Sequence, residues 1–318
     1  MTTGGAGLVA PERARPCPVC GSADESRVFA APNYDLAQLG RHAFASRKLP
    51  EYMHYRLVQC PTCDLVYASP VPSAEGLAQA YDEAAFDSGD EARCAARTYG
   101  RLLGPILRRL PDRATAIDVG TGDGAFLEEL AAAGFETVIG VEPSAAPIAA
   151  ARPHVRPWIR HATFRESDFP AAAASLVACF QTLEHLPDPA AFCRSALRLL
   201  KPGGAVVFVG HDYRAAVNRL MGRRSPIFDI EHLQLFSRRS MAEMLQRSGF
   251  ADVQVRPITN RYPLHYWLKL APLPGFLKRA VYETAKATTL GGMQVPLPVG
   301  NIAAVGFKPA APAAAVTS

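Results

Sequence analysis

The sequence of 318 residues lacks any apolar run long enough to cross a lipid bilayer. Its longest apolar stretches, residues 171–180 and 203–210, fall well short of the ~20 residues that a membrane helix needs. The N-terminus also lacks a positively charged segment followed by an apolar run, so we expect no secretory signal and a cytoplasmic location. Disulfides are not expected in that reducing compartment.

A concentrated patch of positive charge is missing as well. The net charge is only +5, and the arginines are spread along the chain apart from pairs such as 223–224 and 238–239. This distribution permits an anionic substrate without requiring one. It speaks against a nucleic-acid partner, because such proteins usually carry a basic stripe on one face. The hydrophobic content of 49% is sufficient for one full-sized core and a small appendage.

Four of the seven cysteines form two Cys-x-x-Cys pairs, Cys17 with Cys20 and Cys60 with Cys63. Two such turns can close the four-sulfur shell of a structural zinc ion, and a closed shell leaves no open position for a substrate. The alternative is a redox pair, which would need one Cys-x-x-Cys at a strand-to-helix junction. The 39 residues between the two pairs are longer than a minimal zinc ribbon needs, and their role is left open.

Composition and hydrophobic periodicity divide the chain into segments. We expect disordered tails at 1–14 and 309–318, a zinc ribbon domain at 15–72, a helical bridge at 73–112, and an α/β domain at 113–308 with a lid insertion at about 257–300. Strands and helices alternate in the α/β domain, which favours a mainly parallel sheet covered by helices. The expected strands are 115–119, 137–141, 158–160, 176–182, 205–209, 253–258 and 302–307, and the expected helices are 125–133, 145–151, 190–200 and 238–248.

A glycine-rich turn follows the first of these strands. Gly120, Gly122 and Gly124 are spaced more tightly than the glycines of a dinucleotide fingerprint, and Asp118 just before them would repel a phosphate. Glu142 ends the next strand, where a carboxylate can accept hydrogen bonds from ribose hydroxyls. These features predict a nucleoside without phosphate and with a positive centre, and S-adenosylmethionine fits. The alternative is a glycine turn in an unrelated doubly wound fold.

The D-x-G-x-G-x-G turn, the acid at the strand end and the Leu-Glu-His-Leu segment at 183–186 resemble the class I S-adenosylmethionine-dependent methyltransferases over residues 75–308. The resemblance implies a Rossmann-like sheet that is mainly parallel with an antiparallel last strand. The implied cofactor residues are Asp118, Gly120, Thr121, Gly122, Gly124, Glu142, Pro143 and Gln181, with Tyr81 as a cover. The usual adenine-contacting acid has no counterpart at 161–164, since Asp168 comes late.

The segment Glu231-His232-Leu233-Gln234-Leu235-Phe236-Ser237 is similar to a stretch of zinc-containing sugar C-methyltransferases from deoxysugar pathways. That resemblance implies that His232 is a general base beside Glu231 and that His185 is a further active-site histidine. Asp229 stands where those enzymes have a tyrosine. Two other interpretations remain open: His232 as a lid residue before a helix N-cap at Ser237, and His185 as a residue that only ties down its loop.

The resulting hypothesis is an enzyme that methylates a small molecule or sugar, at oxygen or carbon, in specialised-metabolite or polysaccharide biosynthesis. One rival is a methyltransferase acting on ribosomal or transfer RNA, because some such enzymes pair a zinc knuckle with this fold. A second rival is a non-catalytic binding module with the same fold. The sequence does not identify the acceptor or the oligomeric state.

Overall fold

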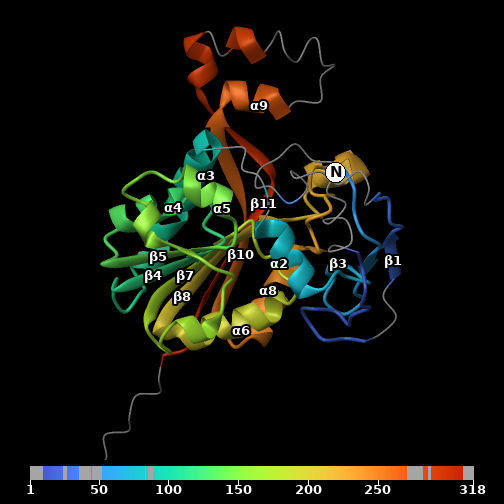
Figure 1. Cartoon of the computed structure of the whole chain (residues 1–318), viewed down its shortest axis with the longest axis horizontal. Coiled ribbons are helices and arrows are strands. Elements are labelled where there is room, and N and C mark those ends of the chain that lie inside the picture. Colours follow the sequence, from blue (N-terminus) through green and yellow to red (C-terminus); the bar gives the residue numbers. More distant parts are fainter. Residues whose placement is uncertain are drawn as a thin grey trace, which may run out of the picture.

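The computed structural model describes residues 10–23, 27–35, 44, 52–82, 84, 89–270, 282–285 and 288–310. Their strands form one sheet of seven strands and one of four. Figure 1 shows the larger sheet near the centre of the molecule and the smaller sheet beside it. Among the helices of these described residues, none has both the length and the apolar content of a membrane-spanning segment.

The seven-stranded sheet has the order β10-β11-β8-β7-β4-β5-β6. Its members are β4 (Thr115–Val119), β5 (Thr137–Glu142), β6 (Ile159–His161), β7 (Ala174–Phe180), β8 (Leu200–His211), β10 (Ala251–Pro263) and β11 (Gln294–Phe307). Strands β4 to β8 pair in parallel, whereas β11 runs antiparallel to both β8 and β10. This confirms the predicted Rossmann-like α/β sheet with an antiparallel last strand.

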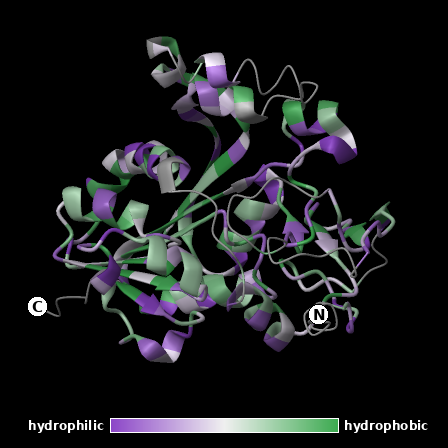
Figure 2. Cartoon of the chain, turned by 45° about the horizontal axis from the view of Figure 1, so that its top comes forward, coloured by the Kyte–Doolittle hydropathy of each residue, from purple (hydrophilic) through white to green (hydrophobic). Residues whose placement is uncertain are grey.

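Helices cover both faces of this sheet. Strand β7 is buried along its whole length, as expected of a central parallel strand between two helical layers. Alternate side chains point to opposite faces. Val177 and Cys179 cluster with α6 (Pro189–Leu199) and α8 (Arg238–Arg247), whereas Leu176 and Ala178 cluster with α3 (Gly89–Leu107) and α4 (Ala125–Ala132). Figure 2 shows both purple and green along the helices, consistent with one polar and one apolar face.

Further helices lie in loops between strands or beside the sheets. They are α2 (Ala74–Asp82), α5 (Ala145–Ala150), α7 (Ala216–Met221) and α9 (Leu264–Leu270). The segment predicted as a helical bridge therefore contains two helices, α2 and α3.

Strands β10 and β11 form a long antiparallel hairpin, paired from Ala251 opposite Phe307 to Pro263 opposite Gln294. Its tip extends beyond the sheet toward α9, at the top of Figure 1. The lid insertion expected at 257–300 thus begins inside β10 and ends inside β11. Residues 271–281 of that insertion lie outside the described residues.

The small sheet has the order β1-β2-β3-β9, all antiparallel. Strands β1 (Arg27–Ala30), β2 (Leu57–Gln59) and β3 (Val66–Ala68) come from the predicted zinc ribbon, but β9 (Gln234–Leu235) comes from the predicted α/β domain. Cys17, Leu65 and Tyr67 also share one apolar cluster with Met241 of α8. The domain boundaries stay a prediction, and the small sheet crosses one of them.

Candidate active site and metal site

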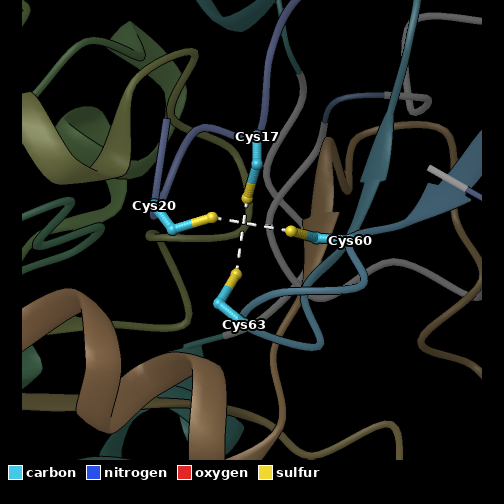
Figure 3. A group of neighbouring side chains, drawn as sticks. All are labelled: Cys17, Cys20, Cys60 and Cys63. Atoms are coloured by element: carbon cyan, nitrogen blue, oxygen red, sulfur yellow. Dashed lines mark hydrogen bonds between the residues drawn. The ribbon is translucent and has the colours of Figure 1, made fainter. Parts of the chain in front are cut away.

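The four paired cysteines meet at one point. In Figure 3 the Cys17 and Cys20 side chains come from one loop and those of Cys60 and Cys63 from another, and all point toward a common centre. The Cys17 and Cys63 sulfurs are 3.4 Å apart, those of Cys20 and Cys60 are 3.5 Å apart, and all four sulfurs lie within 4.8 Å of one another. Around a tetrahedral zinc with bonds of about 2.3 Å, sulfurs are about 3.8 Å apart. The thiols therefore fit this ion.

The two cysteine turns have the same backbone form. The Gly21 amide donates to the Cys17 carbonyl at 2.9 Å, and the Asp64 amide donates to the Cys60 carbonyl at 3.1 Å. Gly21 and Asp64 also share a positive φ, 72° and 70°. Two matching turns are typical of a zinc ribbon and are not needed for a redox pair, so this geometry supports the zinc prediction.

The glycine-rich turn joins β4 to α4. Gly120, Gly122 and Gly124 all have a positive φ, between 59° and 75°, which glycine adopts without strain. A Cβ at Gly120 would lie 2.2 Å from Thr182 Oγ1, whereas a Cβ at Gly122 would meet nothing within 4 Å. Gly122 therefore presents open backbone. Gly124 packs against neighbouring side chains, since a Cβ there would lie 2.5 Å from Val155 Cγ1.

Two acids frame this turn. The Thr121 hydroxyl donates to Asp118 Oδ2 at 2.7 Å, and burial raises the pKa of Asp118 to about 7. The Glu142 carboxylate accepts the Gly122 amide at 2.8 Å and the Ser144 amide at 2.9 Å, and burial raises its pKa. A carboxylate has about four acceptor positions. Glu142 therefore holds the turn in shape and has further acceptor positions beyond these two bonds.

Among the described residues, two buried oxygens near this turn have no hydrogen-bond donor, Asp118 Oδ1 and Gln181 Oε1. Buried polar atoms normally have a partner. Together with the open backbone at Gly122, these acceptors fit a ligand with an amino group and a cationic centre, as S-adenosylmethionine has. Thr163 and Phe164, after β6, line the same space, whereas Asp168, the last residue of a short 3-10 helix, does not line it.

One cavity of about 1300 Å³ lies at the carboxyl ends of the parallel strands. Small-molecule pockets commonly measure about 300–1,000 Å³, so two ligands can lie side by side in this space. The lining contains the predicted catalytic residues and, apart from Gly124, the predicted cofactor residues: Tyr81, Asp118, Gly120, Thr121, Gly122, Glu142, Pro143, Gln181, His185, Glu231 and His232.

Three histidines gather on one side of the cavity. The ring centroids of His185 and His232 are 5.0 Å apart, and those of His211 and His232 are 5.3 Å apart. His185 Nδ1 lies 3.6 Å from the Glu231 carboxylate. One donor atom from each of His185, Glu231 and His232 lies within 4.8 Å of the others, a spacing that also fits a cation.

His232 has a defined tautomer. Its Nδ1 lies 2.8 Å from the Ile227 carbonyl oxygen. A carbonyl can only accept, so Nδ1 carries the ring proton and Nε2 keeps its lone pair. Burial, reinforced by His211, lowers the pKa of His232. The imidazole is therefore neutral near pH 7 and able to accept a proton.

Tyr81 lies beside His185 instead of only covering the cofactor. Its hydroxyl is 2.7 Å from His185 Nδ1, and burial raises the pKa of Tyr81 well above its usual value. The phenol is therefore protonated and can donate to that nitrogen. Burial, together with the charge of His232, lowers the pKa of His185 to about 3.

Glu184 contacts the histidine group through His211. It is fully buried, and its Oε1 accepts the His211 amide at 2.7 Å and lies 3.3 Å from His211 Nδ1. Burial raises the pKa of Glu184, but the interaction with His211 and the charges of His232 and His185 outweigh burial and bring the pKa to about 2. A buried carboxylate that stays ionised favours a cationic histidine nearby.

Sequence reasoning did not commit to His211, Glu184 or the guanidinium of Arg15, which hydrogen-bonds to the loops that carry the histidines. His211 follows a strand end, and that position is a usable signal. Arg15 has no such signal, since nothing in its sequence surroundings indicates that it contacts residues near 187 and 233.

Known proteins are similar to this chain in sequence. Residues 91–255 match a family model described as a methyltransferase domain. The chain is 30% identical over 168 residues to a ubiquinone biosynthesis O-methyltransferase from Nitrosomonas europaea, covering 47% of this chain and 71% of the relative. A protein of the same description from Stutzerimonas stutzeri is 37% identical over 98 residues, covering 29% of this chain and 42% of the relative. The chain thus spans less than half the length of that second relative.

Two solved structures are similar to this chain. One is the YcgJ protein from Bacillus subtilis, with 18% identity, a TM-score of 0.45, and coverage of 66% of this chain and 99% of that one. The other is an S-adenosylmethionine-dependent methyltransferase from Archaeoglobus fulgidus, with 17% identity, a TM-score of 0.45, and coverage of 67% and 94%.

Proposed function

Since the chain belongs to the methyltransferase domain family, we propose that it transfers the methyl group of S-adenosylmethionine to an oxygen or carbon of a small molecule or sugar. The acceptor would belong to specialised-metabolite or polysaccharide biosynthesis. A hydroxyl oxygen is the acceptor atom that we favour, because the relatives are named O-methyltransferases.

A single observation supports this proposal most directly. His232, with its Nδ1 proton held by the Ile227 carbonyl, lines the same cavity as the glycine-rich turn. A proton acceptor therefore lines the same cavity as the turn that we propose binds the cofactor. Holding an acceptor in line with the reacting methyl group supplies much of the rate acceleration in such a transfer.

The cofactor residues in this proposal are Asp118, Gly120, Thr121, Gly122, Glu142, Pro143 and Gln181. When bound, S-adenosylmethionine supplies an electrophilic methyl group on a sulfonium. Asp118 and Gln181 offer their unpartnered oxygens to its amino and cationic groups, and Glu142 offers carboxylate positions to the ribose. The cysteine cluster would hold zinc for structure only, because four thiolates close its shell.

His232 is the proposed base. Its Nε2 would take the proton of the acceptor hydroxyl, and the ring would become an imidazolium. The nearby charges of Glu184 and Asp229 favour that cation. Glu231 and His185 line the acceptor side of the cavity, where Glu231 can bind a second acceptor hydroxyl and Tyr81 fixes the orientation of His185.

The test is the His232→Ala variant, assayed with radiolabelled S-adenosylmethionine against a panel of phenols, sugars and keto compounds. Turnover is expected to fall by about 100-fold or more, with unchanged cofactor affinity in calorimetry. The matched control is His154→Ala, because His154 is an exposed histidine paired with Glu128 outside the cavity. Unchanged turnover in His232→Ala rules out the base.

His185, Glu231 and His232 lie close enough to one another to bind a cation, so a second experiment tests for a metal ion at these side chains. Turnover should survive treatment with a chelator that leaves the zinc content at one ion per chain, because a free His232 takes the proton. Activity that is lost under these conditions and returns with Mg²⁺ or Mn²⁺ would show a cation at these side chains and contradict the free base.

A further inference from the structure

The segment that carries His232 is built onto the small sheet of the zinc ribbon. Strand β9 begins two residues after His232 and pairs with β3, with Gln234 opposite Tyr67 and Leu235 opposite Val66. The Ala68 amide also donates to the Leu233 carbonyl at 2.7 Å. The position of His232 therefore depends on strands that come from the N-terminal part of the chain.

Gln234 connects this segment to the loop that carries His185. Its side-chain amide donates to the Leu183 carbonyl at 2.5 Å and to the Leu186 carbonyl at 2.8 Å. The Leu233 amide donates to the Glu184 carbonyl at 2.8 Å. The Gln234 backbone amide also donates to the Glu184 carbonyl at 3.3 Å, so four hydrogen bonds link the two histidine loops, which are far apart in sequence.

The Arg15 guanidinium hydrogen-bonds to the end of β3, to the loop that carries His185 and to the segment that carries His232. Its Nη1 donates to the Pro187 carbonyl at 2.6 Å, and its Nη2 donates to the Leu233 carbonyl at 2.9 Å and to Gln234 Oε1 at 3.1 Å. Its Nε donates to the Ala68 carbonyl at 3.0 Å. Arginine is the only side chain with five donors in one rigid plane, so it can satisfy four acceptors in fixed directions.

The backbone at Arg15 is itself fixed from both sides. Two residues later, Cys17 enters the four-sulfur cluster. Two residues earlier, the Arg13 backbone forms a bridge with Val71, and the Arg15 amide donates to the Ser69 hydroxyl at 3.3 Å. The guanidinium is therefore anchored to the cysteine cluster and to the end of β3 before it reaches the histidine loops.

We propose that Arg15 is a positioning residue for methyl transfer, which sets the spacing of His185 and His232 by joining their loops to the zinc ribbon. This inference rests on the proposed function of His232. It gives the ribbon a role in turnover, because a displacement of about 1 Å at a reacting group can lower a rate by about 100-fold.

The experiment uses the full-length zinc-loaded chain and the variant Arg15→Gln. Side-chain NMR of ¹⁵N-labelled histidine rings should show displaced His185 and His232 signals, assigned with His185→Asn and His232→Asn variants. The kcat toward the acceptor identified in the panel should fall by about 10- to 100-fold. Calorimetry with S-adenosylhomocysteine should give wild-type affinity, because the hydrogen bonds of the Arg15 guanidinium do not involve the glycine-rich turn.

Arg13→Gln is the matched control. The Arg13 side chain is exposed and lies two positions from Arg15 on the same backbone segment. It should leave the ring signals and kcat unchanged. Arg15→Lys keeps the charge but loses the planar fork, so it should give a partial loss and serves as the test variant if Arg15→Gln does not fold.

Wild-type ring signals and kcat in a folded, zinc-loaded Arg15 variant would overturn the proposal. The ring signals need no acceptor, so this outcome is separate from a failure of the proposed function. If His232→Ala keeps full turnover while the Arg15 variant still displaces the rings, His232 is not the base but the positioning network is real. If turnover falls only as far as the zinc content falls, Arg15 has a structural role and no positioning role.

Discussion

The side chain of His232 can be tested by its protonation. Burial lowers its pKa below the usual 6.5, so the ring stays neutral to a lower pH than a free histidine. Only the neutral ring can take a proton, so kcat should be constant near neutral pH and fall only at a lower pH than it would with an ordinary histidine as the base. A plot of log kcat against pH checks this. An acid limb that persists unchanged in His232→Ala would assign the titration to another group.

Asp118 should make the affinity for the cofactor depend on pH near neutrality. Burial raises its pKa to about 7, so the ligand-free protein holds it partly protonated at neutral pH. A bound cation favours the carboxylate. The affinity for S-adenosylmethionine should therefore rise several-fold between about pH 6 and pH 8. Calorimetry at several pH values measures it.

Asp118→Asn is the corresponding variant. It cannot ionise, so its affinity should be weaker and nearly independent of pH, and a wild-type pH profile in this variant would refute the role.

The raised pKa of Asp118 also predicts that the stability of the ligand-free protein depends on pH. Because the folded-state pKa lies above the unfolded value of 3.8, this group's stabilising contribution is lost as the pH rises through about 7 in the ligand-free protein.

Single residues differ in how far the sequence could place them. The positions of Asp118 and Glu142 were predictable because Asp118 is next to last in β4 and Glu142 ends β5, each at a fixed distance from the glycines. Tyr81 was predicted to cover the cofactor, which stays a prediction, but the contact of its hydroxyl with His185, far along the chain, was not expected. Arg15 was missed because four acceptors on three separate segments define its role. Local patterns do not record contacts of that range.

At the scale of elements, the turn between β4 and α4 depends on the absence of a side chain. In Gly120→Ala, the new Cβ would lie 2.2 Å from Thr182 Oγ1 at a φ of 75°. Strain at such a position costs about 1–3 kcal/mol. Urea unfolding should show this loss of stability. Gly292→Ala is the control, because a Cβ at that glycine meets nothing within 4 Å, and equal stability of the two variants would contradict the strain.

The central strands and their helices could be predicted because their apolar patterns are local, and β4, β5, β7, α4, α6 and α8 follow those expectations. The hairpin of β10 and β11 was underestimated, since its prolines at positions 257, 263, 296 and 298 conceal a strand pattern. Proline is tolerated on an edge strand such as β10. Strand β9 has two residues, too few for any periodicity.

At the scale of the whole molecule, the predicted zinc ribbon and the α/β part share one apolar cluster, which contains Cys17, Tyr67, Phe236 and Met241. Removing the metal ligands should therefore destabilise both parts together. Cys60→Ala should lose zinc, shift the thermal midpoint downward in a single transition, and lower turnover by more than the loss of folded protein explains. Calorimetry, zinc analysis and kcat measure these.

Two separate transitions, with only the smaller one sensitive to Cys60, would show that the parts fold independently. A metal-free variant with normal stability would contradict the zinc site itself. The matched control is Cys193→Ala, because Cys193 is a buried cysteine outside the four-sulfur cluster. Its loss of stability should leave the zinc content at one ion per chain.

The place of β9 in the small sheet limits how this protein can be cut or inherited. A chain shortened to the region after residue 72 would leave a two-residue strand without its neighbour and the adjacent histidine without a fixed backbone. Recombination that exchanged the N-terminal region for that of another enzyme would have to replace β9 and its loop at the same time. We therefore expect the sequences of the small sheet and of the loop around residue 232 to change together.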